Sequence, residues 1–402
     1  MLELEEALAR VLAIMPFPVS ETVPLSAAHG RIAISQVVSP IDLPVFDNSA
    51  MDGYAVRAAD VAPANVNAPV RLRLAGRVAA GESFTGEMAA GACIRVFTGS
   101  PLPGGADAVV MQEDTRVDPE KSDDILVMEA AKPWENMRFR GEDIKQDSVL
   151  AKEGDQLNAR RISLLAASGV ARVNVSRQPV IGLLATGSEL REPGEALGPG
   201  QIYESNRLGL SALLRNAGAI PKIFPIVRDA AHEVRGAVEL AFKQCDAVVT
   251  SGGVSVGEMD FIKSAFEAVG GELQFWRVAL KPGRPFVFGR YGKKFLFGLP
   301  GNPVSALVTF LLLVRPALLR WQGALDISLP VHSGILAEPL ANAGARRHFM
   351  RVKVDAEGKV FSAGIQASHL LRSLAEANGL VDVPPETTLM PGTAVRVLSW
   401  GD

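Results

Sequence analysis

Residues 246–253 read DAVVTSGG, an apolar run that ends in a pair of glycines. Two other segments have the same form: PVIGLLAT at 179–186 and FLFGLPG at 295–301. Each run is apolar at successive positions, which is typical of a strand that is buried on both faces of a helix-covered parallel sheet. We therefore expect a doubly wound α/β domain, with ligands bound at the carboxyl ends of its strands.

The alternation of strands and helices extends over residues 176–327, which we assign to this α/β domain. Its expected helices are 206–218, 229–243, 258–270 and 303–321, and its further strands are 223–227 and 275–280. On either side the apolar runs are shorter and alternate with polar residues, which indicates β-rich structure. We expect a β-rich N-terminal lobe over 1–175, with one helix in the first fifteen residues and another at 158–168, and a small C-terminal β-barrel over 328–402.

The composition excludes several classes of protein. A length of 402 residues predicts several domains. With 41 basic and 44 acidic residues the net charge is −3, so nothing points to nucleic acid. The first fifteen residues carry acids where a secretory signal needs basic residues, and the longest apolar run, 304–314, is shorter than a membrane span. We expect a soluble cytoplasmic protein that binds no membrane.

A glycine-rich turn follows the strand at 246–251 and precedes a helix. Backbone amides at such a turn can hold a phosphate, and the helix dipole favours the negative charge. The predicted phosphate-binding residues are Ser251, Gly252, Gly253 and Ser255. The turn lacks the P-loop and dinucleotide-binding motifs. Glycine also occurs in such turns because it permits tight packing, so this alternative stays open.

Three carboxylates follow strands at the same edge of the expected sheet. Glu189 ends the segment TGSE, Asp229 follows the strand at 223–227, and Asp260 comes shortly after the glycine-rich turn. Each could be an ordinary loop or helix-start acid. Their convergence beside a phosphate site would instead suit Mg²⁺, which prefers oxygen ligands.

Cationic residues follow in the segment WRVALKPGRP at 276–285. As residues of one strand, Arg277 and Lys281 would face the same side. They could be surface cations, or they could bind an anion together with Ser305, which lies at the start of the apolar helix at 303–321. The N-terminal lobe adds two polar segments, FDNSAMDGYAV at 46–56 and NMRFRGEDIK at 136–145, whose acids and arginines could equally be turn residues or surface ion pairs.

Eight segments together resemble one family, the molybdopterin molybdotransferases or MoeA proteins, whose eukaryotic relatives are gephyrin and the E domain of Cnx. The segments are FDNSAMDGYAV, RVFTGSPLPGGADAVVMQE, RGEDI, TGSEL, GQIYESN, SGGVSVGEMD, KPGRPFVFG and GLPGNPVSA. They occur in order along nearly the whole chain.

The resemblance implies the last step of molybdenum cofactor synthesis, in which adenylylated molybdopterin and molybdate give the cofactor and AMP with the help of Mg²⁺. It also implies an elongated homodimer of four domains. The N-terminal part would form two intertwined subdomains, the inserted one at about 46–143, and the lobe of one subunit would face the α/β domain of the other. Transient contact with a molybdopterin adenylyltransferase or with molybdoenzyme maturation factors is also implied.

Residues matched to the family motifs acquire roles from the resemblance. The implied functional acids and their companions are Asp52, Asp143, Glu189, Asp229, Asp260, Thr98 and Arg138, with Glu189, Asp229 and Asp260 as Mg²⁺ ligands. The implied oxyanion side is Arg277, Lys281, Pro282, Ser305, Arg351 and Ser368, with Pro300 and Pro303 shaping the loop. The chain departs from the family where Arg277 replaces a common lysine and where Ser188 replaces a common aspartate. Two other functions stay open: a molybdopterin adenylyltransferase, and a non-enzymatic scaffold like gephyrin.

Overall fold

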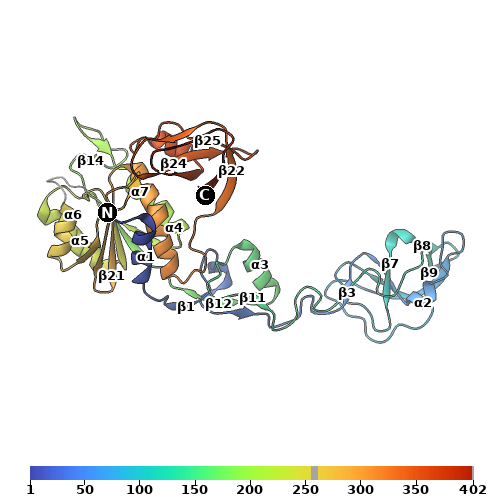
Figure 1. Ribbon diagram of the computed structural model, residues 1–402. Helices are drawn as coiled ribbons and strands as arrows, with labels where there is room; N and C mark the ends of the chain where they lie inside the picture. Colours follow the sequence, from blue (N-terminus) through green and yellow to red (C-terminus); the bar gives the residue numbers. More distant parts are fainter. Residues whose placement is uncertain (255–260, 401–402) are drawn as a thin grey trace.

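The protein is elongated, with a two-domain body at one end and a β-rich lobe at the other (Figure 1). The computed structural model describes residues 1–254 and 261–400. The body consists of the α/β domain and the C-terminal barrel, and a narrow middle lobe joins it to the distal lobe (Figure 1). The expected multidomain architecture is confirmed.

The α/β domain is built on a six-stranded sheet in the order β16-β13-β17-β21-β20-β18. The strands are β13 (Val180–Ala185), β16 (Ile220–Ile223), β17 (Ala247–Ser251), β18 (Glu272–Phe275), β20 (Val287–Tyr291) and β21 (Lys294–Leu299). The first four strands in this order are parallel, whereas β20 and β18 are antiparallel to their neighbours. Every residue of β17 is buried, as its uninterrupted apolar pattern predicts.

Helices cover both faces of this sheet, so the doubly wound arrangement is confirmed. On one face, α4 (Asn206–Asn216), the helix that begins at Pro303, and α1 (Leu4–Ala13) share one apolar core with the sheet. On the other face, α5 (Ala231–Gln244) and α6 (Phe261–Ala268) form a second core. The N-terminal helix thus packs on the α/β domain, although the chain continues from it into the middle lobe.

The helix that begins at Pro303 is continuous through α7 (Pro303–Thr309), a π-helical segment η3 (Phe310–Val314) and α8 (Arg315–Trp321). Pro316 lies just after the π-helical segment and lacks the N–H group that an α-helix needs, so a wider turn is favoured there. By length and composition this helix could cross a membrane, but 78% of the relevant window is buried inside the protein. We interpret it as a core helix.

Two strand predictions need correction. The strand expected at 223–227 is observed as Ile220–Ile223, and residues 224–227 form the loop that leads to α5. The strand expected at 275–280 is divided: β18 ends at Phe275, and β19 (Leu280–Lys281) pairs with the barrel strand β24. Arg277 and Lys281 therefore do not share one strand, because the chain leaves the central sheet between them.

The middle lobe consists of two segments that are far apart in the sequence. Its antiparallel pairs are β1 (Ser20–Pro24) with β12 (Arg172–Ser176) and β2 (Val37–Val38) with β11 (Val149–Ala151). The short helix η1 (Leu25–Ala27) and α3 (Ala159–Ala167) pack in its core. The side chain of Asn158 caps α3 by accepting from the Arg161 amide, and Gly169, just after the helix, has a positive φ of 79°.

The distal lobe is a second six-stranded sheet, in the order β7-β4-β6-β5-β9-β8. Its strands are β4 (Gly53–Val56), β5 (Val70–Val78), β6 (Ala92–Val96), β7 (Ala108–Met111), β8 (Thr115–Asp118) and β9 (Lys121–Val127), with α2 (Ala58–Val61) and η2 (Gln112–Asp114) between them. At the junction with the middle lobe, β3 (Asn48–Ser49) pairs with β10 (Met137–Arg138).

The C-terminal domain is a closed barrel, as the sequence predicts. Its strands are β22 (Val331–Leu336), β24 (Arg347–Val354), β25 (Lys359–Ser362), β26 (Gly379–Val383) and β28 (Ala394–Ser399). The β24–β26 pairing closes the circle. A small ribbon of β23 (Leu340–Asn342) and β27 (Thr387–Leu389) and a short helix α9 (Leu371–Ala375) belong to this part of the chain. Two further paired strands, β14 (Leu190–Arg191) and β15 (Ile202–Tyr203), precede α4 in the sequence.

We propose domain boundaries at residues 175 and 327, with the inserted subdomain at about 46–143, and we count α1 with the α/β domain. The backbone pairing of β3 with β10 joins the two ends of the inserted part, which supports its placement.

Phe297 provides a test of the core. Its side chain is fully buried, and its ring lies 5.2 Å from that of Phe288. Phe297→Ala should lower the free energy of unfolding by about 3–5 kcal/mol, because it removes buried apolar surface and leaves a cavity. Phe17 is 92% exposed, so Phe17→Ala is the matched control and should change little. Urea titration followed by circular dichroism measures both, and equal effects of the two changes would contradict this description of the core.

Candidate active site at the carboxyl edge of the central sheet

A pocket of about 720 Å³ lies where the parallel strands end. The loops that follow β13, β16, β17 and β21 all contribute to its wall. This is the edge at which the sequence predicts ligands. The predicted site residues that line the pocket are Glu189, Asp229, Ser251, Gly252, Gly253, Pro300, Pro303 and Ser305.

The glycine turn after β17 has a backbone that only glycine adopts easily. Gly252 and Gly253 have φ values of 88° and 67°. A Cβ on Gly252 would lie 2.9 Å from the carbonyl oxygen of Thr186. A Cβ on Gly253 would lie 2.8 Å from the hydroxyl oxygen of Thr186. The amide of Gly252 donates to the Leu299 carbonyl, so it is already engaged in holding the turn. The predicted phosphate-binding residue Ser255 lies outside the described residues.

Two of the three predicted metal ligands lie on this pocket. Asp229 is fixed by a reciprocal contact with Ser188: its carboxylate accepts from the Ser188 amide at 3.1 Å, and its own amide donates to the Ser188 hydroxyl at 3.2 Å. Glu189 is the next residue, and its carbonyl accepts from the Ile202 amide. The serine that departs from the family pattern thus anchors one acid beside the other.

The third predicted ligand, Asp260, lies outside the described residues. Among residues 1–254 and 261–400, no three His, Cys, Asp or Glu side chains lie close enough to hold a metal ion. Mg²⁺ is commonly bound by one or two carboxylates together with substrate phosphates. Glu189 and Asp229, both on a pocket that opens to a glycine turn, therefore suit the donor set that Mg²⁺ requires.

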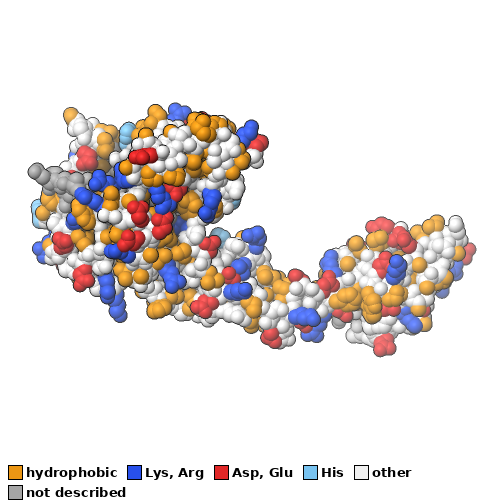
Figure 2. All heavy atoms as spheres, in the orientation of Figure 1, with side chains coloured by type: hydrophobic (Ala, Val, Ile, Leu, Met, Phe, Trp, Pro, Cys, Tyr) orange, Lys and Arg blue, Asp and Glu red, His pale blue; other side chains and the backbone are white. Residues whose placement is uncertain are grey.

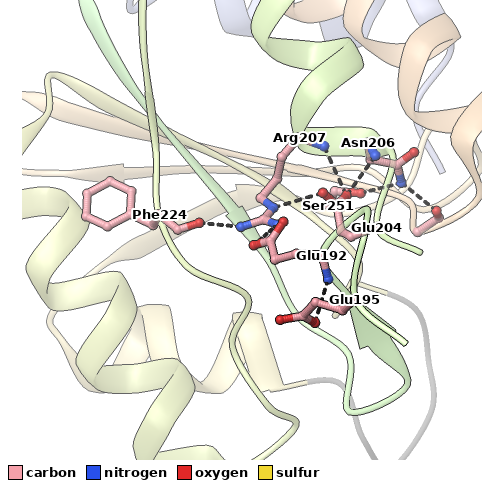
Figure 3. A network of polar contacts seen from close by, with 8 residues as sticks. Glu192, Glu195, Glu204, Asn206, Arg207, Phe224 and Ser251 are labelled. Carbon is pink, nitrogen blue, oxygen red and sulfur yellow. Dashed lines mark hydrogen bonds and ion pairs between the residues drawn. The ribbon is translucent and has the colours of Figure 1, made fainter. Parts of the chain in front are cut away.

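A buried polar network behind the pocket was not predicted from the sequence (Figure 3). Arg207 is 2% exposed, and its guanidinium pairs with Glu204 at 2.9 Å and with Glu192 at 2.7 Å. Burial alone would lower the pKa of Arg207, but its hydrogen bonds to Glu192 and Glu204 outweigh burial and raise that pKa. The arginine therefore stays charged inside the domain.

Asn206 precedes this arginine and connects two of the strand ends. Its side-chain amide donates to the Ser251 hydroxyl and to the Gly301 carbonyl, each at 2.7 Å (Figure 3). Asn206 belongs to the segment GQIYESN, which resembles the family motif. The sequence does not show, however, which groups the side chain of this asparagine contacts. Its side chain holds the ends of β17 and β21 together.

The predicted oxyanion residues are not gathered in one place. Lys281 lines a smaller hollow of about 260 Å³ together with His348, next to the buried Pro282. Arg277 instead lies over the ring of Trp276, with its Cζ 3.9 Å from the ring centroid. The sequence expectation that Arg277 and Lys281 are residues of one strand is therefore wrong for this chain.

Arg351 and Ser368 each form a hydrogen bond with a residue that lines one of these hollows. Arg351 is fully buried, and its Nη2 donates to the carbonyls of Ile365 and Ala367, whereas Nε and Nη1 have no partner among the described residues. Ser368 accepts from the Asn302 side chain at 3.1 Å, and Asn302 lines the larger pocket. A buried guanidinium with free N–H groups is a strong anion receptor.

The remaining predicted residues lie on the distal lobe and at its junction with the middle lobe, about residues 46–143, which we call the N-terminal arm. Asp52 accepts from the amide and the hydroxyl of Thr98, each at 2.8 Å. These two hydrogen bonds, aided by the charge of Arg95, lower the pKa of Asp52. Arg138 and Asp143 are exposed near the junction of the distal and middle lobes. Within one chain this arm lies far from the pocket (Figure 1), so the structure pairs Asp52 with Thr98 but brings neither to the sheet edge.

The fold and the site together define a class: a multidomain protein whose central domain is of a molybdopterin-binding type. Residues 182–320 match a family model described as a probable molybdopterin binding domain. Residues 2–169 match the MoeA N-terminal region (domain I and II), and residues 333–400 match the MoeA C-terminal region (domain IV). The chain belongs to the MoeA family, as its sequence motifs indicate.

Relatives match over nearly the full length. The chain is 40% identical to a molybdopterin molybdenumtransferase of Haemophilus influenzae, over 96% of this chain and 95% of the relative. It is 38% identical to molybdopterin molybdenumtransferase 2 of Mycobacterium tuberculosis, over 94% of each. A solved structure of a molybdopterin biosynthesis MoeA protein from Pyrococcus horikoshii is 30% identical, with a TM-score of 0.83 and full coverage of both chains. Relatives so named are transferases.

His348 provides a test of the smaller hollow. It is 3% exposed, and its Nε2 has no partner among the described residues. Burial, aided by the nearby cations Lys281, Arg351 and Arg346, lowers the pKa of His348 to about 4. The folded state thus binds this proton less tightly than the unfolded state, whose histidine pKa is about 6.5. Stability must therefore fall as the pH drops from about 6.5 towards 4.

By proton linkage, the free energy of unfolding should fall by about 2 kcal/mol on account of His348 when the pH is lowered from 7 to 5. His348→Gln should lose this part of the pH dependence, whereas replacement of the exposed His29 by Gln should keep it. Urea midpoints at the two pH values measure the difference. An unchanged pH dependence in His348→Gln would show that the imidazole is not held neutral.

Proposed function

We propose that this protein is a molybdopterin molybdenumtransferase that joins molybdate to adenylylated molybdopterin and releases AMP. In this reaction the phosphoanhydride bond breaks, and an oxygen from molybdate or water joins the adenylyl phosphorus. The pterin keeps its phosphate, and its dithiolene sulfurs bind the metal while one molybdate oxygen leaves as water. The observation that carries the proposal is the pocket of about 720 Å³ with two carboxylates and a glycine turn, in a chain of the MoeA family.

The phosphate side of the site is the glycine turn and the two acids. Glu189 and Asp229 would hold Mg²⁺, with Asp260 as a further ligand that lies outside the described residues. When bound, Mg²⁺ supplies positive charge that stabilises a phosphoanhydride oxygen as AMP leaves. The protein's own part is to fix the two carboxylates, which the Ser188 contacts do for Asp229. Gly252 and Gly253 line the pocket, and because neither residue carries a Cβ the turn can pack closely against Thr186.

The oxyanion side must overcome repulsion between two anions. Two unit charges 4 Å apart repel by about 4 kcal/mol at an effective dielectric constant near 20, so cations are needed next to the molybdate. Lys281, and Arg351, whose Nε and Nη1 have no partner in the part of the chain that the structure describes, would supply them, with Ser305 and Ser368 as hydrogen-bonding groups. Since Arg277 lies over Trp276, we give it the lesser role of a nearby positive charge.

A homodimer would complete the site. Asp52, Thr98, Arg138 and Asp143 lie on an arm that cannot reach the pocket of its own chain (Figure 1). Figure 2 shows a wide hollow between the barrel and the distal lobe, and acidic and basic side chains are interspersed over this face. We propose that the arm of a second copy faces the pocket, and that the distal-lobe acids form the opposite wall. We also propose that the protein works in the cytoplasm.

The function can be tested by a turnover assay with adenylylated molybdopterin, Mg²⁺ and increasing molybdate, in which AMP is measured. The wild-type protein should release AMP only when molybdate is present. Consumption of ATP with release of pyrophosphate would instead indicate an adenylyltransferase, and the absence of any cofactor-forming activity would favour a scaffold.

Lys281→Ala should raise the molybdate concentration needed for half-maximal AMP release by about tenfold, since it removes a charge-assisted contact. Lys353 is an exposed lysine of β24 in the same barrel, and Lys353→Ala is the matched control. If both variants titrate with molybdate as the wild type does, the oxyanion site lies elsewhere.

A further inference from the structure

Two consecutive residues at the start of α4 contact all four loops that form the pocket. Asn206 reaches the end of β17 and the loop after β21, through the Ser251 hydroxyl and the Gly301 carbonyl. Arg207 reaches the loop after β13 through Glu192, and the loop after β16 through the Phe224 carbonyl (Figure 3).

Glu204 fixes the start of the helix itself. One of its carboxylate oxygens accepts from the amides of Asn206 at 2.7 Å and Arg207 at 3.0 Å, and the other accepts from the Arg207 side chain. Glu204 is 3% exposed and lines the pocket. Acceptance of helix N-terminal amides by a carboxylate is favourable, because the helix dipole is positive there. The two residues therefore have little freedom to move.

The loops that they contact carry the predicted metal ligands. Glu192 lies three residues after Glu189, and the backbone between them is pinned by Glu204, whose amide donates to the Arg191 carbonyl at 2.9 Å. Phe224 opens the loop that leads to Asp229. A substitution at the start of α4 should therefore alter the positions of both carboxylates, although neither carboxylate contacts Asn206 or Arg207 directly in the described residues.

We propose that Asn206 and Arg207 are positioning residues that set the distance between the carboxylate pair Glu189–Asp229 and the glycine turn. The effect of this positioning on activity rests on the proposed function, because the distance affects the reaction only if a metal ion and a phosphate bind next to each other there. The positioning itself is a property of the fold. It holds whether the bound phosphate comes from adenylylated molybdopterin or from another nucleotide-like compound.

Charge makes Arg207 the stronger of the two contacts. Without it, Glu204 would be left buried without a cation, and a buried unpaired carboxylate is strongly unfavourable. Arg207→Met could therefore fail to fold. Glu192 is the accessible partner, with 49% of its side chain exposed, so Glu192→Gln weakens the network but leaves the Glu204–Arg207 pair intact.

The first test measures the backbone. Hydrogen–deuterium exchange should be several-fold faster in Glu192→Gln than in the wild type over residues 187–204 and 224–229, because these segments lose an anchor. Arg177→Gln is the matched control: it removes a two-contact ion pair with Asp246, just before β17 at the opposite edge of the same sheet. It should leave both segments unchanged. Equal exchange in Glu192→Gln and wild type, or the same increase in the control, would overturn the proposal.

The second test measures the chemistry through Asn206. Asn206→Asp keeps the shape but replaces two donors with an acceptor that repels the Gly301 carbonyl. The Mg²⁺ concentration needed for half-maximal AMP release should rise by about tenfold, as for other groups that orient metal ligands, with the molybdate requirement unchanged. Asn216→Asp, at the exposed end of the same helix, is its control. An unchanged Mg²⁺ requirement in Asn206→Asp would overturn the proposal.

The two tests separate this inference from the proposed function. If the wild-type protein releases no AMP, the proposed function fails, and the exchange measurement still decides whether the start of α4 holds the loops. If AMP is released but neither variant differs from its control, the function stands and the positioning role is wrong.

Discussion

The site depends on the parallel arrangement of β13, β16, β17 and β21, which makes four loops meet at one edge of the sheet. Antiparallel strands would send alternate loops to opposite edges, and the acids could not converge. Strands β13, β17 and β21 are almost completely buried, so each must be covered by helices on both faces, whereas β16 is a largely exposed edge strand. The pocket is thus a consequence of how the core packs.

The same edge shows why one domain is not sufficient for the proposed chemistry. The sheet loops supply carboxylates and a glycine turn, whereas the cations Lys281 and Arg351 come from the connection to the barrel and from the barrel itself. Arg351 is fully buried, and its Nε and Nη1 have no partner among the described residues, which is unfavourable unless an anion binds there. In the proposed dimer the distal lobe would contribute a further acid, Asp52, which Thr98 holds by two hydrogen bonds. In our account three domains, one of them from a second copy, bring opposite charges around two anions.

Much of this could be predicted from the sequence where the signal is local. Apolar runs ending in glycine identified central strands, and their positions after strands of an expected parallel sheet placed Glu189 and Asp229 on one edge. Nonlocal pairing was not visible. The spacing of Arg277 and Lys281 predicts that they belong to one strand. In the structure Lys281 pairs with the barrel strand β24, and no local pattern in the sequence indicates this pairing.

Arg207 illustrates the same limit for charges. A charged residue in a helix is usually exposed, and only the fold brings Glu192 and Glu204 close enough to keep it charged when buried. The spacing of apolar residues predicted helix α1, but it did not predict that this helix packs on the α/β domain. Local periodicity thus predicts elements, whereas tertiary contacts decide what their polar residues do.

The most direct test of the central claim, a site shared between two copies, is complementation between inactive variants. Asp52→Ala alters only the arm and Asp229→Ala only the pocket, so a mixed dimer would contain one intact site. Mixing the two variants after dissociation and reassociation should restore about a quarter of wild-type AMP release, as statistical pairing of subunits in a twofold dimer requires. No recovery from a mixture that demonstrably forms mixed dimers would contradict the shared site.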